Sequence, residues 1–448
     1  MTLRSSFAYH NFTLIKDHLI GVVLLFGIIV SIPLSSVYAK ENKELLTLKQ
    51  SIRIAMNSTP EMKVAEAQIG SQQGKLSRIN VWPNPSVSVQ MDNVLGIEDA
   101  SGGYDITELA ISQPIPLYRL KHQQKQAELG IAKAKTQYQH QQFLLEFKVA
   151  KLFHDLQLKK STLVLAKKRL QQIRRHQNTN REPNVSDHIV RYLTPLEIMR
   201  LDIVLQTAKQ TVAVAEGKYN EAASSFKSLL GLPLNQSLYL PKLKPVTASY
   251  KRKVLDEALQ NHPALKAKRQ GIEEAQAGIA VAESQLFSDP VVTLYRRNEY
   301  LANQRHAVTG LAVSIDLPFW NQNQGSVVEA QYAVQQTQAE LDIKQRELRT
   351  SLYKSYLHLG HLIEQAKHYQ NKVLKPAKKM FKLTQSGFEV GELSVLTLLD
   401  AYNTYFDALS NHKIMLTQAW QELAALRLSA GISLVQPSKI MSTLEKES

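Results

Sequence analysis

The chain has 448 residues and a formal net charge of +15, with 54 lysines and arginines against 39 acidic residues. It contains no cysteine, which excludes disulfide bonds, thiolate metal sites, thiol nucleophiles and a lipidated amino-terminal cysteine. A charge this large can indicate nucleic-acid binding, but the basic residues are spread along helical faces, so we expect no nucleic-acid partner.

The amino terminus predicts secretion. Arg4 and Lys16 precede an uninterrupted apolar stretch at 19–34, and the tripeptide Val-Tyr-Ala at 37–39 is a small-residue cleavage pattern. Residues 1–39 therefore have the pattern of a signal peptide. A single membrane anchor is the alternative, but the apolar stretch is shorter than the ~20 residues of a spanning helix. No later stretch is apolar enough for such a helix, so a mature chain that crosses a membrane must use strands.

The mature chain is a tandem repeat. "AMNSTPEM" at 55–62 returns as "ALQNHPAL" at 258–265, and "LTPLEIMRL" at 193–201 returns as "LSVLTLLDA" at 393–401. The distance along the chain between the two copies of each motif predicts a division of the chain into five parts. These are the signal peptide at 1–39, a first repeat at 40–231, a linker at 232–250, a second repeat at 251–432 and a carboxy-terminal tail at 433–448.

Long helices fill most of each repeat. Apolar residues recur at alternating spacings of four and three residues in the segments 145–173, 198–229 and 395–426. This seven-residue spacing is typical of helices packed as left-handed coiled coils. The helical region from Leu117 to about Gln177 would reach about 90 Å at 1.5 Å per residue.

Short strands lie between the helices of each repeat. "SVSVQMDN" at 86–93 and "ITELAISQ" at 106–113 alternate apolar with polar residues, and residues 290–296 and 309–316 repeat the pattern. Four aromatic residues stand beside prolines where these strands meet the helices, as in the aromatic girdle of a membrane interface. They are Trp82, Tyr118, Phe319 and Trp320. Because four strands cannot close a barrel, a membrane position requires several subunits. The alternative is a soluble α+β protein whose strands pack on its helices.

The sequence resembles the TolC-like outer-membrane efflux protein family across nearly the whole mature chain. The most specific matches are "VWPNPSVSV" at 81–89, "DLPFWNQNQGSVVEAQ" at 316–331 and "GFEVGELSVLTLLDAYNTYFDAL" at 387–409. The junction phrases "WPNP" and "LPFWNQNQG" are most like those of the CzcC-type heavy-metal branch. The resemblance implies a mainly α fold with a membrane β-barrel, in which each of two repeats has two strands and a coiled-coil hairpin. Three chains would form a twelve-stranded barrel in the outer membrane of a Gram-negative bacterium, continuing into a periplasmic α-barrel.

The resemblance also implies partners and site residues. The partners are two further copies of the chain, a periplasmic adaptor, an inner-membrane resistance-nodulation-division pump and outer-membrane lipid. We expect Asp400 and Thr397 at the pore constriction, and Phe388, Gly391 and Leu393 at the periplasmic tip, where the helix pattern breaks. Alternation along the strands predicts lumen-facing side chains in the barrel. These are Ser88, Glu108, Ser112 and Ser314.

The sequence contains no recognisable catalytic nucleophile, metal cluster or cofactor-binding loop, so we expect neither an enzyme nor a cofactor. His358, His361 and Glu364 could share one helical face and bind a metal, but solvated histidines on a coiled coil are commoner, and we assign no metal site. The exported compound stays open: heavy-metal efflux competes with drug efflux and type I protein secretion. A periplasmic adaptor is a further alternative, but an adaptor would carry one hairpin flanked by β-rich domains.

Overall fold

The computed structural model describes residues 45–92, 105–179, 194–248, 250–301 and 304–435. Residues 45–448 cluster as one compact unit. The expected signal peptide and most of the expected tail lie outside the described residues. Among the residues that the structure describes, none of the helices combines the length and apolar character needed to cross a membrane.

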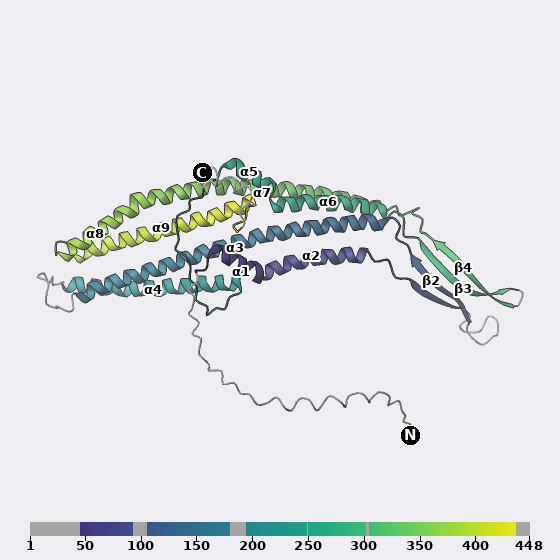
Figure 1. The fold of residues 1–448 in the computed structure, drawn as a ribbon, viewed down its shortest axis with the longest axis horizontal. Helices are drawn as coiled ribbons and strands as arrows, with labels where there is room; N and C mark the ends of the chain where they lie inside the picture. The colour runs from purple at the N-terminus through teal and green to yellow at the C-terminus, as the bar shows by residue number, and fades with distance from the viewer. Residues whose placement is uncertain (1–44, 93–104, 180–193, 249, 302–303, 436–448) are drawn as a thin grey trace, which may run out of the picture. The chain divides into compact units, whose positions relative to one another are not determined.

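Each repeat contains two short helices, two strands and a long helical hairpin (Figure 1). The first repeat comprises α1 (Leu48–Ser58), α2 (Pro60–Ile79), β1 (Ser86–Asp92), β2 (Asp105–Pro114), α3 (Arg119–Thr179) and α4 (Pro195–Leu230). The second comprises α5 (Arg252–Gln260), α6 (Pro263–Ser284), β3 (Val291–Leu301), β4 (Gln304–Ser314), α7 (Gln324–Tyr369), the π-helix η1 (Gln370–Leu374), α8 (Lys375–Glu389) and α9 (Val395–Ala430). The order confirms the predicted succession of strand pair and hairpin, and it adds the helix pairs α1–α2 and α5–α6.

Equivalent residues of the two repeats make equivalent turns. Thr194 and Ser394 are the N-caps of α4 and α9, and each side chain accepts a hydrogen bond from the backbone N–H three residues on. Gly231 and Gly431 end those helices in left-handed conformations, with φ of 66° and 71°. The repeat deduced from short sequence motifs is therefore a repeat of backbone geometry.

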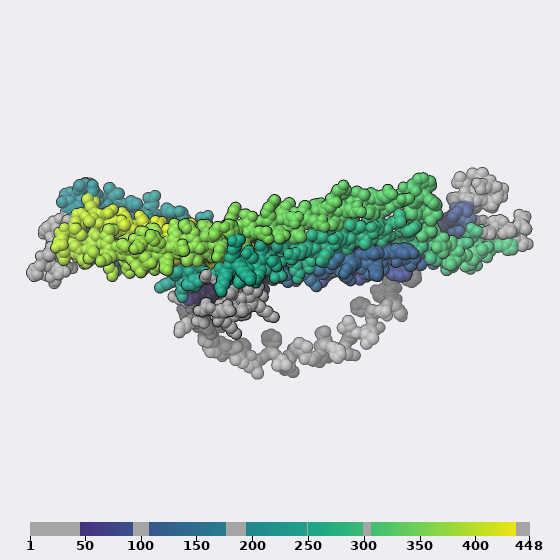
Figure 2. Space-filling model, turned by 90° about the horizontal axis from the view of Figure 1, so that it is seen from above, coloured from purple at the N-terminus to yellow at the C-terminus, as the bar shows by residue number. Residues whose placement is uncertain are grey.

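Helix α3 organises the bundle. Its 61 residues extend about 90 Å, as predicted, and it contacts α2, α4, α6 and α9. Within the unit, the sheet lies at one end of α3 and the hairpin ends lie at the other (Figure 1). Seen from above, α6 and α7 run side by side and the strands β3 and β4 extend beyond them (Figure 2).

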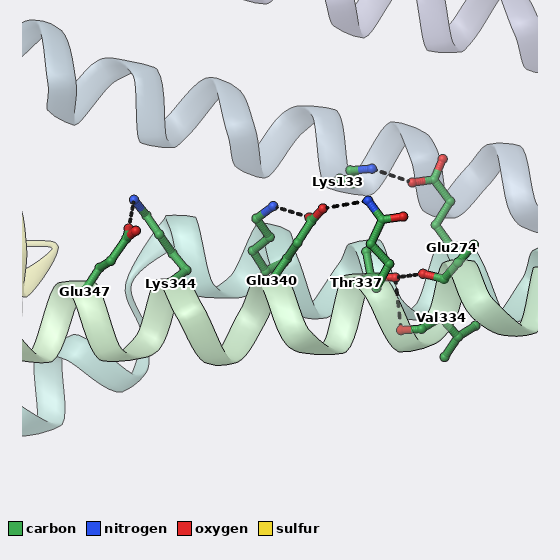
Figure 3. Close-up of polar contacts among 10 residues, drawn as sticks. Lys133, Glu274, Val334, Thr337, Glu340, Lys344 and Glu347 are labelled. Atoms are coloured by element: carbon green, nitrogen blue, oxygen red, sulfur yellow. Dashed lines mark hydrogen bonds and ion pairs between the residues drawn. The ribbon is translucent and has the colours of Figure 1, made fainter.

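Ion pairs join neighbouring antiparallel helices of the bundle. Lys133 of α3 binds Glu274 of α6 at 2.9 Å, and Lys268 of α6 binds Glu340 of α7 at 2.7 Å. Figure 3 shows Glu274 and Glu340 in successive contacts along this surface. The hydrogen bond from Lys268 holds the pKa of Glu340 below its usual value. Exposed pairs of this kind add little stability, so they chiefly fix the register of the helices.

Two apolar cores lie near the middle of the helices, one in each repeat. Val149, Phe153, Leu156 and Phe226 are buried in the first core, and Leu255, Leu265 and Leu426 are buried in the second. The linker at 232–250 packs against both, because its apolar residues Leu238, Leu240, Leu243 and Val246 are buried. The segment between the two repeats is therefore packed against the helices.

Candidate functional site: an apolar sheet face and a hairpin tip

The four strands form one antiparallel sheet in the order β1-β2-β3-β4. The register joins the two repeats through β2 and β3, with Ile111 opposite Leu294 and Ser112 opposite Thr293. Directly opposed residues share a face, so the register assigns every side chain to one side of the sheet.

One face is apolar. The row Val87, Ile111, Leu294 and Leu311 crosses all four strands, and Val89, Leu109 and Val313 lie on the same side. These side chains remain exposed: Val87 is 65% exposed, Leu311 68% and Val313 66%. No described helix covers this face, and an exposed apolar surface of this kind is typical of a membrane or protein contact.

The other face is polar. Ser88, Glu108, Ser112 and Ser314, the residues predicted to face a lumen, all lie on it by register. The hydroxyls of Ser112 and Thr293 are 2.8 Å apart across β2 and β3. The register thus places these four residues on one face, and their position in a lumen stays a prediction.

Aromatic residues stand at the junction of sheet and helices. The four predicted there are exposed: Trp82 55%, Tyr118 63%, Phe319 71% and Trp320 95%. Tyrosine and tryptophan have an apolar ring and a polar group, so they favour the boundary between lipid and water. The apolar face therefore has an aromatic border on the side of the helices.

The sheet ends in two edges. Within the described residues, β1 pairs only with β2, and β4 pairs only with β3. An edge strand presents unpaired backbone N–H and C=O groups that can pair with another strand. The sheet can therefore be extended at both sides.

The end of the second hairpin is a tight turn between α8 and α9. Gly391 has a φ of 84°, and Glu392 and Leu393 donate backbone hydrogen bonds to the carbonyl of Gly387. A β-carbon at Gly387 would lie 2.7 Å from Leu393 Cδ1, so Leu393 packs directly on it. Phe388 is half-buried in the same turn. Phe388, Gly391 and Leu393 thus lie in one turn, and α9 begins two residues after Leu393, at Val395.

Asp400 and Thr397 lie one helical turn apart on an exposed face of α9. Asp400 makes no ion pair or hydrogen bond with any described residue. The Thr397 hydroxyl lies 3.0 Å from the hydroxyl of the N-cap Ser394. Thr397 therefore has a local capping contact as well as its exposed position.

Polar contacts below the tip tie α9 to α3. The Tyr402 hydroxyl donates to Gln172 Oε1 at 3.2 Å, and Arg169 donates to the side chain of Asn403. Phe381 of α8 stacks on Tyr405. Burial raises the pKa of Tyr402 to about 12, so its hydroxyl stays a donor at neutral pH. The two hydrogen bonds between α3 and α9 were not predicted, because they join residues 230 and 234 positions apart.

The histidines of α7 do not assemble with Glu364. His358 Nδ1 lies 3.1 Å from Glu422 Oε2 of α9. In the described part of the chain, no three histidine or acidic side chains come close enough to hold a metal ion. The described structure therefore does not group His358, His361 and Glu364 as metal ligands.

Residues 254–432 match the family described as outer membrane efflux protein. This segment, which runs through α5 to α9, is similar to that family, in agreement with the resemblance drawn from the sequence motifs. The family match lies in the second repeat, whose geometry the first repeat reproduces at the helix caps and glycine turns.

Relatives resemble the chain over most of its length. Over 400 residues it is 24% identical to the cobalt-zinc-cadmium resistance protein CzcC of Cupriavidus metallidurans, which covers 86% of this chain and 90% of CzcC. The fold is similar to that of the open-state Neisseria gonorrhoeae MtrE outer membrane channel, with a TM-score of 0.68, 17% identity and coverage of 87% and 90%. It is also similar to CusC, studied for transmembrane channel formation, with a TM-score of 0.66, 16% identity and coverage of 86% and 92%.

Proposed function

We propose that this chain is the outer-membrane exit channel of a tripartite efflux system and that it exports heavy-metal cations. One observation carries the proposal: an apolar sheet face with an aromatic border is exposed, and both edges of the sheet are unpaired within the described chain. Lipid against this face would remove exposed Val, Leu and Ile side chains from water. The polar face would then line water.

The open edges require further copies of the chain. Lipid does not tolerate unpaired backbone groups, so β4 of one copy would pair with β1 of the next. Three copies of the four-stranded sheet would close a twelve-stranded barrel. The long hairpins would continue as an α-helical tunnel into the periplasm, since α3 alone spans about 90 Å. In this proposal the signal peptide at 1–39 is removed and the mature chain is not lipidated.

The trimer is tested by mass. Purified in detergent, the mature protein should elute as three copies by light scattering, and cysteines placed at a pair of facing positions on β1 and β4 should cross-link into trimers. The native chain has no cysteine, so it is the matched uncrosslinked control. A monodisperse monomer would contradict the proposal.

Asp400 is proposed to form an acidic ring at the periplasmic tip. The exposed position of Asp400 on α9 supports this role, as does the lack of an ion pair with any residue that the structure describes. Three carboxylates near a threefold axis would attract cations and repel anions. In planar bilayers, Asp400→Asn should lower cation selectivity and weaken block by multivalent cations, while Thr397→Ser should not. Equal selectivity and block in wild type and Asp400→Asn would remove Asp400 from the pore.

The metal cargo is proposed from the likeness to CzcC, a cobalt-zinc-cadmium resistance protein. The partners would be a periplasmic adaptor and an inner-membrane resistance-nodulation-division pump. A deletion strain should lose tolerance to cobalt, zinc or cadmium and regain it from a plasmid copy. Unchanged metal tolerance together with greater sensitivity to drugs or detergents would favour a drug-efflux channel instead.

A further inference from the structure

An aromatic ring lies flat on the polar face of the sheet. In the register, Ser88, Ala110, Tyr295 and Gly310 form one row across the four strands. Three of these residues are small and the fourth is the large Tyr295. A row of this composition leaves room for one ring to lie along the sheet.

The position of the ring depends on Gly310. A β-carbon added at Gly310 would lie 2.4 Å from Tyr295 Cζ, 2.4 Å from its hydroxyl oxygen and 2.9 Å from Cε1. Real β-carbons do not approach other atoms so closely, so the ring occupies the volume that any other residue at 310 would need. Gly310 has no left-handed φ, and backbone conformation therefore does not require glycine there.

The surroundings restrict where the ring could move. On the other side of Tyr295 in the same row, Ala110 is only 3% exposed, so the space above it is already filled. The guanidinium of Arg297 lies 5.4 Å from the ring centroid. A ring displaced by a β-carbon at position 310 would move away from the sheet, into the space over its polar face.

We propose that Gly310 is a positioning residue that keeps Tyr295 flat against the barrel wall and thereby sets the width of the lumen. The proposal rests on the proposed function, in which the polar face lines a trimeric channel. In a trimer, three Tyr295 rings flat against the barrel wall leave the lumen open. Three rings that point away from the wall would project into the lumen from three sides. In a barrel of intermediate strand number, side chains of this size decide how much of the interior is left for water.

A purely structural role for the pair is the competing explanation. An aromatic ring from a neighbouring strand can cover a glycine of an edge strand and stabilise the sheet. That role predicts a change in stability and no change in the conductance of assembled channels.

The test uses Gly310→Ala in the full-length protein, assembled as trimers in planar bilayers. One methyl group is too small to narrow a channel, so a fall in single-channel conductance would report the displaced ring. The helical tunnel and its tip lie in series with the barrel and carry part of the resistance, so we expect the total conductance to fall by about a third. The double variant Gly310→Ala/Tyr295→Ala should restore wild-type conductance. Ala312→Val is the matched control, because it adds more volume to an exposed position on the same face of β4 and should change little.

The outcomes separate this inference from the channel proposal. Wild-type protein that forms no channels contradicts the proposed function itself. Wild-type channels with unchanged conductance in Gly310→Ala, or a loss that Tyr295→Ala does not restore, overturn the inference alone. Tyr295→Ala by itself provides a second measurement if Gly310→Ala does not assemble. Its conductance should stay within about 20% of wild type, and a severalfold increase would mean that the ring already stands in the lumen.

Discussion

Acid should weaken the packing of α3 against the linker and α9 at His154. This side chain is 5% exposed, its Nδ1–H donates to Gln157 Oε1 at 2.9 Å, and its ring stacks on Trp420 at 5.1 Å between centroids. Gln157 in turn donates to the carbonyl of Pro241 in the linker. Burial lowers the pKa of His154 from 6.5 to about 4. The neutral ring is therefore the form that the folded protein holds.

The loss of folding stability in acid follows from the lowered pKa of His154. The unfolded chain takes up a proton near pH 6.5, whereas the folded chain does so only near pH 4. The contribution to stability is therefore fully present above pH 6.5 and is lost as the pH falls toward 4. The complete loss corresponds to about 3 kcal/mol, and most of it should have occurred by about pH 4.5.

Urea unfolding followed by far-UV circular dichroism measures this loss. The free energy of unfolding should fall more in wild type than in His154→Gln between about pH 7.5 and about pH 4.5, by roughly 2 to 3 kcal/mol. Glutamine keeps a donor for Gln157 but does not titrate. His140 and His262, whose pKa values burial also lowers, contribute equally to both proteins. His361→Gln, at an exposed position of α7, should behave as wild type. Equal losses in wild type and His154→Gln would refute the reasoning.

Two further substitutions test contacts on which the bundle depends. Gly431→Ala should lower the free energy of unfolding by roughly 1–3 kcal/mol, because φ is 71° and a β-carbon would lie 3.2 Å from the backbone Cα of His262. Gly231→Ala, which would meet only a side chain, should cost less, and a larger loss for Gly231→Ala in urea titrations would contradict this ranking. Tyr402→Phe removes the donor to Gln172 and should speed amide exchange at the start of α9, with a loss of about 1 kcal/mol; unchanged exchange there would mean that the contact does not hold the hairpins together.

The sequence predicted those features that depend on neighbouring residues and on the spacing of apolar residues along a helix or strand. The motifs aligned at 193–201 and 393–401 contain Thr194 and Ser394 at equivalent positions, and both side chains cap a helix by accepting a backbone hydrogen bond. The alternation of Ser88 and Glu108 with apolar neighbours predicted the two faces of the sheet, because successive residues of a strand point in opposite directions. Gly391 marked the turn of the second hairpin, since it adopts a conformation that favours glycine.

Contacts between distant segments could not be predicted in this way. Tyr295 meets Gly310 only because β3 and β4 pair in one register, and alternation alone does not fix a register. His154 meets Trp420 across two helices whose heptads are compatible with several alignments. The π-helix at 370–374 also escaped notice, although Pro376, which cannot donate a backbone hydrogen bond, was a local sign of irregularity.

Accessibility of spin labels on the strands tests the central claim most directly. Single cysteines can be introduced without background, because the chain has none. Labels at Val87, Leu109, Leu311 and Val313 should collide with oxygen dissolved in lipid, and labels at Ser88, Glu108, Ala312 and Ser314 should collide with a water-soluble nickel chelate. This alternation in reconstituted membranes is the result that the account predicts. Uniform accessibility to the nickel chelate at both sets of positions would contradict it, because the sheet would then lie outside the membrane.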